Sequence, residues 1–233
     1  MRSLALATLC ATLAACGPPL DTPDPPGTIS GRIYLMWVDD GGSSGDGTFV
    51  FVPVPGHELT FTRNDPKATL KTITPEMMYT DGGSIPRLAQ VFKGFSPWGY
   101  APAYMVHDWL FIAKNCNTDG KAKGKELLVK DMEFQESAAV MNEAIHALVA
   151  QKMVKPADIA EALIPAVVGG PIARRLWEQD GACEARRVSE ADRKAALAGI
   201  PGGTRLRGTD LRTLDDGRRI PLEPGQLITT FSF

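Results

Sequence analysis

The pattern of apolar and polar positions changes once along the chain, from alternation to a helical spacing. Residues 33–38, 49–52, 59–62 and 71–79 carry alternating or clustered apolar and β-branched side chains, which is typical of strands. After Pro86, large apolar residues recur at every third or fourth position, which predicts helices. The order of these elements predicts an α+β fold with a small N-terminal antiparallel sheet followed by helices.

Two neighbouring helices are expected to pack antiparallel after this sheet. The first covers residues 101–114, in which Tyr104, His107 and Phe111 fall on one face. The polar stretch 115–124 then forms the loop that reverses the chain.

A longer second helix is predicted to run from this loop to about residue 152. Its inward face is expected to contain Leu127, Asp131, Phe134, Ala138, Met141, Ile145 and Leu148. A third helix is expected to start at Pro156, to be kinked at residues 169–171 and to end near Trp177. It would pack across the antiparallel pair.

The N-terminal residues have the layout of a secretory signal. Arg2 supplies a positive charge, residues 4–13 form an apolar run, and small residues precede Cys16. The run is too short to span a bilayer. This arrangement resembles the lipobox of bacterial lipoproteins, which implies that residues 1–15 are removed as a signal peptide and that Cys16 is lipidated. An ordinary cleaved signal with an incidental cysteine is the alternative.

The residue after the cysteine bears on location. In the lipoprotein signal, an aspartate at that position often marks retention in the inner membrane, whereas this chain has Gly17. The resemblance therefore implies a protein anchored by lipid to the periplasmic face of a cell membrane, with the outer membrane favoured.

Three further segments follow the signal peptide. Residues 16–30 are rich in proline and glycine and are expected to form an extended tether. The fold is expected to begin near Ile33, so that residues 31–180 form a single α+β domain. Residues 181–233 are expected to be a C-terminal extension of turns and short elements that ends in a strand over 227–233.

Composition and charge exclude some classes of partner. The chain has 233 residues and a net charge of −2, without a clustered basic stripe. Nucleic-acid binding is therefore not expected. Because no segment after the signal is long and apolar enough to cross a membrane, the lipid anchor is the expected membrane contact. The sequence indicates no protein partner.

Four cysteines leave one candidate disulfide. Cys10 would be lost with the signal peptide and Cys16 would carry lipid, which leaves Cys116 and Cys183. In an oxidising periplasm these two could pair. The alternative is two buried free thiols, and their spacing in the sequence does not decide between them.

Two polar residues occupy positions that the helical spacing assigns to the core. His107 lies on the inward face of the first helix, and Asp131 lies on that of the second. Each would need a partner, because an unpaired polar group in an apolar interior is costly. Both lie seven residues from the connecting loop, so antiparallel packing would bring them level. A His107–Asp131 dyad would fix the imidazole tautomer and leave one ring nitrogen to act as a general base.

A calcium site is the candidate metal centre. Asp108 follows His107 at the margin of the same helix face and could hold a hard cation together with Asp81. Asp81 belongs to a glycine-rich loop with Gly82, Gly83 and Ser84. The sequence does not decide whether this loop binds a ligand or only forms a turn, since glycine pairs also occur in ordinary turns.

These residues resemble a known family. Residues 80–86 (TDGGSIP), residues 103–111 (AYMVHDWLF), and Asp131 with Phe134 are similar to the motifs of the domain-of-unknown-function family 1353, found in bacteriophages and bacteria. The resemblance covers roughly residues 49–148, with mild departures at the second glycine of the loop and at Phe111. That family has no established activity, so the resemblance implies a fold and a site but no reaction.

A looser resemblance bears on the reaction. Calcium-dependent phospholipases also carry a His-Asp pair on one helix, in which the histidine is the base and the aspartate binds calcium. A second aspartate on the antiparallel helix orients the histidine. By this resemblance His107 would be the base, Asp108 would bind calcium, and Asp131 would orient the histidine. The chain lacks the flanking cysteines of the animal enzymes, and residues 81–84 do not clearly match their calcium loop.

Two classes of function stay open at this point. The first is an envelope lipoprotein that hydrolyses ester or lipid bonds with a His-Asp dyad, assisted by calcium. The second is a non-catalytic binding or structural lipoprotein, either of the envelope or derived from a prophage, in which a buried His-Asp pair serves packing alone. The two differ in what they require of His107.

Overall fold

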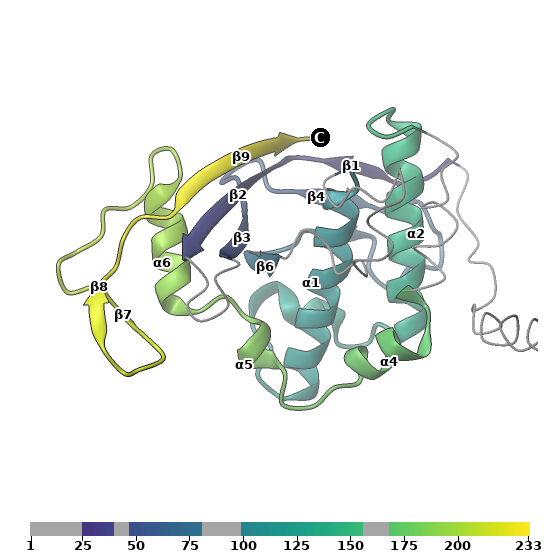
Figure 1. The fold of residues 1–233 in the computed structure, drawn as a ribbon. Coiled ribbons are helices and arrows are strands. Elements are labelled where there is room, and N and C mark those ends of the chain that lie inside the picture. The colour runs from purple at the N-terminus through teal and green to yellow at the C-terminus, as the bar shows by residue number, and fades with distance from the viewer. Residues whose placement is uncertain (1–24, 40–46, 81–98, 156–167) are drawn as a thin grey trace, which may run out of the picture.

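The chain folds into an α+β domain in which helices cover both faces of an antiparallel sheet (Figure 1). The structure is a computed structural model, and it describes residues 25–39, 47–80, 99–155 and 168–233. The predicted α+β class is confirmed.

The main sheet has four antiparallel strands in the order β6-β3-β2-β9. These strands are β2 (Arg32–Asp39), β3 (Thr48–Pro53), β6 (Met78–Thr80) and β9 (Gln226–Ser232). In the register, Leu35 of β2 faces Phe51 of β3 on one side and Thr229 of β9 on the other. The second strand and the last strand of the described chain, β2 and β9, are thus neighbours in this sheet.

Two smaller sheets complete the strands. One has the order β1-β4-β5, with β1 (Thr28–Ser30), β4 (Thr60–Thr62) and β5 (Thr72–Ile73). The other is a hairpin of β7 (Leu211–Thr213) and β8 (Arg219–Pro221). The predicted strand over 71–79 is therefore two short strands in different sheets.

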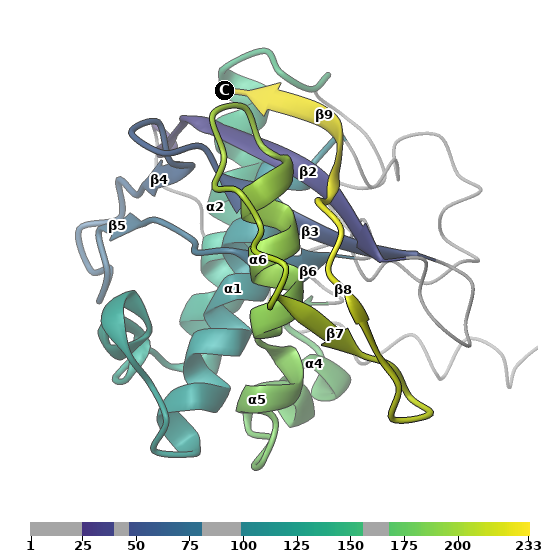
Figure 2. The same cartoon turned by 90° about the vertical axis from the view of Figure 1, so that its left-hand side faces the viewer.

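Alternating side chains of the central strand enter two hydrophobic cores. Ile33 and Leu35 of β2 are buried in the larger core, which also contains the inner faces of α1 (Ala101–Thr118) and α2 (Phe134–Ala150). Met36 and Val38 point to the other face and pack with α6 (Glu190–Gly199). The period of two in a strand explains this division. Figure 2 shows α6 across the sheet from α1 and α2.

The remaining helices are short. The 3-10 helix η1 (Gly124–Val129) lies between α1 and α2, and α4 (Pro171–Trp177) and α5 (Cys183–Arg186) follow α2 in the chain. Pro171 stands in the first turn of α4, where its missing N–H is not needed. This helix confirms the predicted helical stretch that ends at Trp177, whereas residues 156–167 of the expected third helix lie outside the described residues. None of the described helices combines the length and the apolar character that a membrane span requires.

The predicted second helix is interrupted. The chain leaves η1 at Val129 and enters α2 only at Phe134, so a turn separates the two helices. The Nζ of Lys114 in α1 donates hydrogen bonds to the carbonyl oxygens of Lys130 and Met132, at 2.9 and 3.0 Å, and holds this turn. The predicted inward positions from Phe134 onward are buried, but Leu127 and Asp131 are exposed.

Two segments that the sequence analysis placed outside the α+β domain contribute strands to its sheets. Residues 28–30 of the expected tether form β1, whose Ile29 is fully buried. The end of α2 holds this strand, because the side chain of Gln151 exchanges two hydrogen bonds of 2.8 Å with the backbone of Ile29. Residues 181–233 are not a separate extension, since they supply α6 and the main-sheet strand β9.

A buried arginine connects the β1-β4-β5 sheet to helix α2 through ion pairs. The side chain of Arg63, just after β4, is fully buried. Its guanidinium binds both carboxylate oxygens of Glu143 of α2, at 2.9 and 2.6 Å, and one oxygen of Glu136 at 2.5 Å. Burial alone would lower the pKa of Arg63, but the hydrogen bonds and charges of Glu143 and Glu136 outweigh it and raise the pKa. The cation therefore stays charged inside the fold.

Candidate functional site

His107 lies on the inward face of α1 and is only 5% exposed. Its ring packs against the ring of Phe111, one turn further along the helix, with centroids 4.8 Å apart. Phe111 in turn meets the edge of Trp177 at 5.0 Å. The helical spacing that predicted a buried His107 is thus correct, and Trp177 of α4 packs against the next aromatic residue on the same helix face.

The partner of His107 is the residue next to it. Nδ1 of His107 lies 3.2 Å from Oδ1 of Asp108, whose side chain is 39% exposed. A carboxylate at this nitrogen favours the tautomer with the proton on Nδ1 and leaves Nε2 with a free lone pair. Asp108 therefore has the orienting contact that the sequence assigned to Asp131.

Two buried polar atoms near this pair have no hydrogen-bond partner among the described residues. They are Nε2 of His107 and the hydroxyl oxygen of Tyr104. Tyr104 is three residues before His107, so the two side chains are neighbours on one side of α1. Burial, followed by the charges of Tyr100 and Asp108, raises the pKa of Tyr104, and its hydroxyl stays a donor at neutral pH. Such atoms are costly to bury, which makes this part of α1 the candidate site.

The predicted dyad with Asp131 is not formed. Asp131 is exposed in the turn before α2, and the chain on either side of it is held by Lys114. Lys114 is seven residues, or two helical turns, beyond His107. The turn between η1 and α2 removes the continuous helix on which the predicted juxtaposition depended. Asp131 is therefore withdrawn as a site residue.

The predicted calcium site is not assembled by the described residues. Asp108 uses one oxygen for His107, and the described parts of the chain contain no group of three or more His, Cys, Asp or Glu side chains suited to a metal. The other predicted members, Asp81, Gly82, Gly83 and Ser84, lie outside the described residues. We therefore assign no reaction step to a metal.

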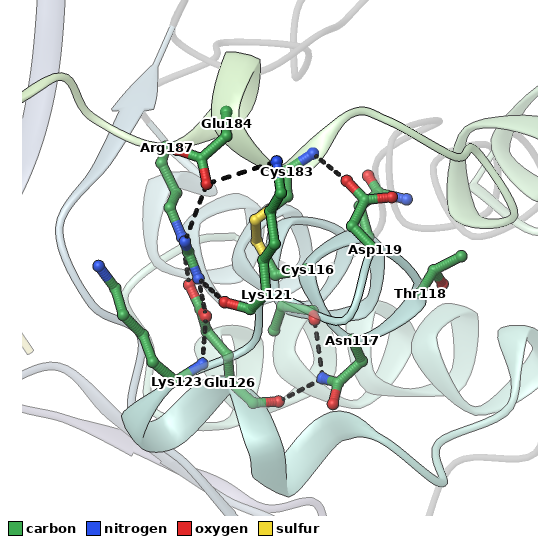
Figure 3. Close-up of a disulfide and its surroundings, with 12 residues drawn as sticks. Cys116, Asn117, Thr118, Asp119, Lys121, Lys123, Glu126, Cys183, Glu184 and Arg187 are labelled. Carbon is green, nitrogen blue, oxygen red and sulfur yellow. Dashed lines mark hydrogen bonds and ion pairs between the residues drawn. A yellow bond between two sulfur atoms is a disulfide. The ribbon is translucent and has the colours of Figure 1, made fainter.

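Of the two alternatives that the sequence left open for Cys116 and Cys183, the structure has the disulfide. Cys116 near the end of α1 and Cys183 at the start of α5 form a disulfide with Cα atoms 4.6 Å apart (Figure 3). Both residues are fully buried. The bond joins segments 67 residues apart in the sequence and fixes the chain after α4 to the end of α1.

Polar contacts that the sequence did not predict surround the disulfide (Figure 3). The carboxylate of Asp119 accepts hydrogen bonds from the backbone N–H groups of Gly181, at 2.7 Å, and Cys183, at 2.9 Å. These bonds, that from Cys183 first, lower the pKa of Asp119. Arg187 makes a bidentate ion pair with the buried Glu126 of η1. The end of α1, η1 and α5 are thereby held as one unit.

Two hollows on the described surface lie around α4. One of about 270 Å³ is lined by Lys114, Thr118, Glu133, Phe134, Arg174, Trp177 and Glu178. Another of about 390 Å³ is lined by Pro171, Arg174, Arg175, Glu178 and Gln179. Both are open and shallow, so neither is a preformed cavity for a substrate of His107.

Comparison with known proteins finds no matching family model, no matching curated protein and no matching solved structure. The motif resemblance described above stays a prediction, and the functional argument rests on the residues of this chain.

Proposed function

We propose that the protein is an exported, lipid-anchored lipoprotein of the bacterial envelope that hydrolyses ester or lipid bonds at His107. The observation that supports the activity most directly is the state of the His107 ring. One nitrogen is held by a carboxylate, and the other is buried without a partner among the described residues. A histidine in this arrangement is prepared to accept a proton.

The alternative that His107 only packs the core is weaker on energetic grounds. A histidine retained for packing should have both ring nitrogens satisfied, since an unpaired buried polar atom costs about 1–3 kcal/mol. Here two such atoms, on His107 and Tyr104, lie on the same helix face. Unsatisfied groups are expected where a ligand completes the hydrogen bonding.

The proposed reaction uses both groups. Nε2 of His107 takes a proton from a water molecule as the water oxygen attacks the ester carbonyl carbon. The carbonyl electron pair moves to the oxygen, which accepts a hydrogen bond from the Tyr104 hydroxyl. The bond to the alcohol oxygen then breaks, and that oxygen takes the proton from Nε2. Ester and water give an acid and an alcohol.

The disulfide supports export. Disulfides persist in oxidising compartments such as the periplasm and are rare in the cytosol, and this chain joins Cys116 to Cys183. Together with the lipobox at Cys16, this pairing favours a protein held by lipid at the periplasmic face, with the outer membrane as the favoured location. A substrate in the envelope would then be within reach.

A non-catalytic binding lipoprotein is the second candidate. The observation that favours it is the presence of two surface hollows around α4, neither of which is lined by His107. This candidate requires no activity and no particular state of His107. Variants of His107 therefore separate the two functions.

The test is hydrolysis of short-chain esters and of phospholipids by the full chain, with calcium and with chelator. We expect His107→Asn to lower kcat by about 100-fold or more, because it removes the general base. Asp131→Asn is the matched control and should leave kcat unchanged, since its carboxylate is exposed in the turn before α2. Tyr104→Phe should lower kcat without lowering Tm, because the lost hydroxyl has no partner in the described fold.

Asp108 is a positioning residue in this proposal. Its test therefore needs a measurement other than the rate of hydrolysis. The chain has only three histidines, so nitrogen NMR can assign the ring of His107. We expect the proton on Nδ1 in the wild type and a changed tautomer ratio in Asp108→Asn. Equal hydrolysis by wild type and His107→Asn, or no hydrolysis by either, would leave the binding lipoprotein as the better account.

A further inference from the structure

The helix η1 exposes two consecutive leucines. Leu127 is 55% exposed and Leu128 is 57% exposed. Among the exposed large hydrophobic residues of the described chain, only these two adjoin in the sequence. The short helix inserts Val129 into the core, and Met132 of the following turn is also fully buried, which leaves both leucines outside.

Lysines surround these leucines. Lys121, Lys123 and Lys130 are exposed and Lys125 is half-buried, all within one stretch of ten residues. We call these four lysines with the two leucines the η1 patch. Apolar side chains flanked by lysines are the composition of surfaces that lie on a membrane.

The acidic residue inside this stretch does not neutralise the patch. Glu126 is 4% exposed and points inward, where Arg187 binds both of its carboxylate oxygens (Figure 3). The Lys123 backbone N–H donates to the same carboxylate at 2.8 Å. The negative charge of Glu126 is therefore compensated within the fold, and the lysine charges remain on the surface.

Several acidic groups lie near the patch lysines: Glu184, Glu58 and Asp131 are exposed, and Asp119 and Glu76 are half-buried. Glu184 lies 3.8 Å from the Nζ of Lys121, a separation at which exposed ion pairs are weak. Backbone hydrogen bonds and, to a smaller extent, the charge of Lys125 lower the pKa of Glu58, and Asp131 follows Lys130 in the turn. None of them makes a close hydrogen-bonded pair with a patch lysine among the described contacts.

We propose that the η1 patch docks on an anionic phospholipid surface. The lysines would attract the phosphate groups, and Leu127 and Leu128 would enter the boundary between headgroups and acyl chains. This contact is separate from the lipid on Cys16 and from the chemistry at His107. It would hold the end of α1, η1 and α5 toward the membrane.

The test is hydrogen–deuterium exchange on the full chain, purified as cells produce it, with phosphatidylglycerol or phosphatidylcholine vesicles. We expect exchange of the amides of residues 121–130 to slow by roughly fivefold with phosphatidylglycerol only. The effect should disappear in about 0.5 M salt, which screens surface charge. The β7–β8 hairpin, residues 211–221, is the internal control and should exchange equally in both.

Variants assign the effect to the patch. Leu127→Ser with Leu128→Ser, and separately Lys123→Glu with Lys130→Glu, should each abolish the difference between the two lipids. Ile172→Ser on α4 is the matched control, because Ile172 is 78% exposed outside the patch. Equal exchange with both lipids in the wild type, or slowing that survives in the patch variants, would overturn the proposal. The comparison holds with or without lipid on Cys16, because any anchor inserts into both vesicles.

Discussion

Replacing Arg63 with alanine is expected to destabilise the protein by about 3–5 kcal/mol. The change removes the guanidinium that binds both oxygens of the Glu143 carboxylate. This carboxylate would stay buried without a cation, because the Glu143 side chain is only 1% exposed. Glu136 would also lose the guanidinium, although it keeps a hydrogen bond of 2.7 Å from the Thr69 backbone N–H. The measurement is urea unfolding followed by circular dichroism.

Two further variants separate charge burial from mere loss of an ion pair. Arg63→Met combined with Glu143→Leu removes both buried charges and should recover much of the lost stability. Arg218→Ala breaks an exposed ion pair with Asp216, at 2.6 Å, and should change stability by less than about 0.5 kcal/mol. An Arg63→Ala protein as stable as Arg218→Ala would show that the buried cluster does not hold β4 to α2.

Loss of the disulfide is expected to cost about 4 kcal/mol. The bond closes a loop of 67 residues, and a loop of this length restricts the unfolded chain strongly. We expect Cys116→Ala with Cys183→Ala to unfold at a clearly lower urea concentration than the wild type. A reducing agent should shift the wild type to the same midpoint and leave the double variant unchanged.

Other contacts near the disulfide determine how much structure the protein keeps when the bond is removed. Two residues still connect α1 to the later chain: Asp119, and Asn115, whose buried amide donates to the carbonyls of Leu176, Trp177 and Gln179. Arg187 still connects η1 to the chain after α5. The double variant should therefore stay folded at low urea. A midpoint that is the same with and without the bond would mean that these contacts alone fix α4 and α5.

Local periodicity predicted much of the fold. The strands around Leu35 and Phe51, the helix that carries His107, and the buried face from Phe134 to Leu148 follow from spacing alone. The helix of residues 190–199 begins after Ser189, whose hydroxyl accepts a hydrogen bond from the Asp192 N–H. These features depend on neighbours in the sequence, which is why the sequence contains enough information for them.

Features that depend on distant contacts were not predicted. The turn that exposes Asp131 is held by Lys114, and the helical spacing continues through it without a visible break. The pairing of β9 with β2 and the Arg63 cluster join residues far apart in the sequence. The His107–Asp108 contact was missed because consecutive helix residues normally point apart, whereas a short carboxylate reaches Nδ1 of its neighbour.

Export and anchoring at Cys16 are the premise of the proposed role, because the proposed substrate lies in the envelope and the disulfide is typical of an oxidising compartment. The most direct measurement is mass spectrometry of the N-terminal tryptic peptide from membranes of cells that express the full chain. Arg32 is the first basic residue after Cys16, so we predict a peptide of residues 16–32 with acyl chains on the cysteine. Cys10→Ser should give the same peptide, and Cys16→Ser should not. A chain that still begins at Met1, or a peptide with an unmodified Cys16, would contradict the proposed lipoprotein.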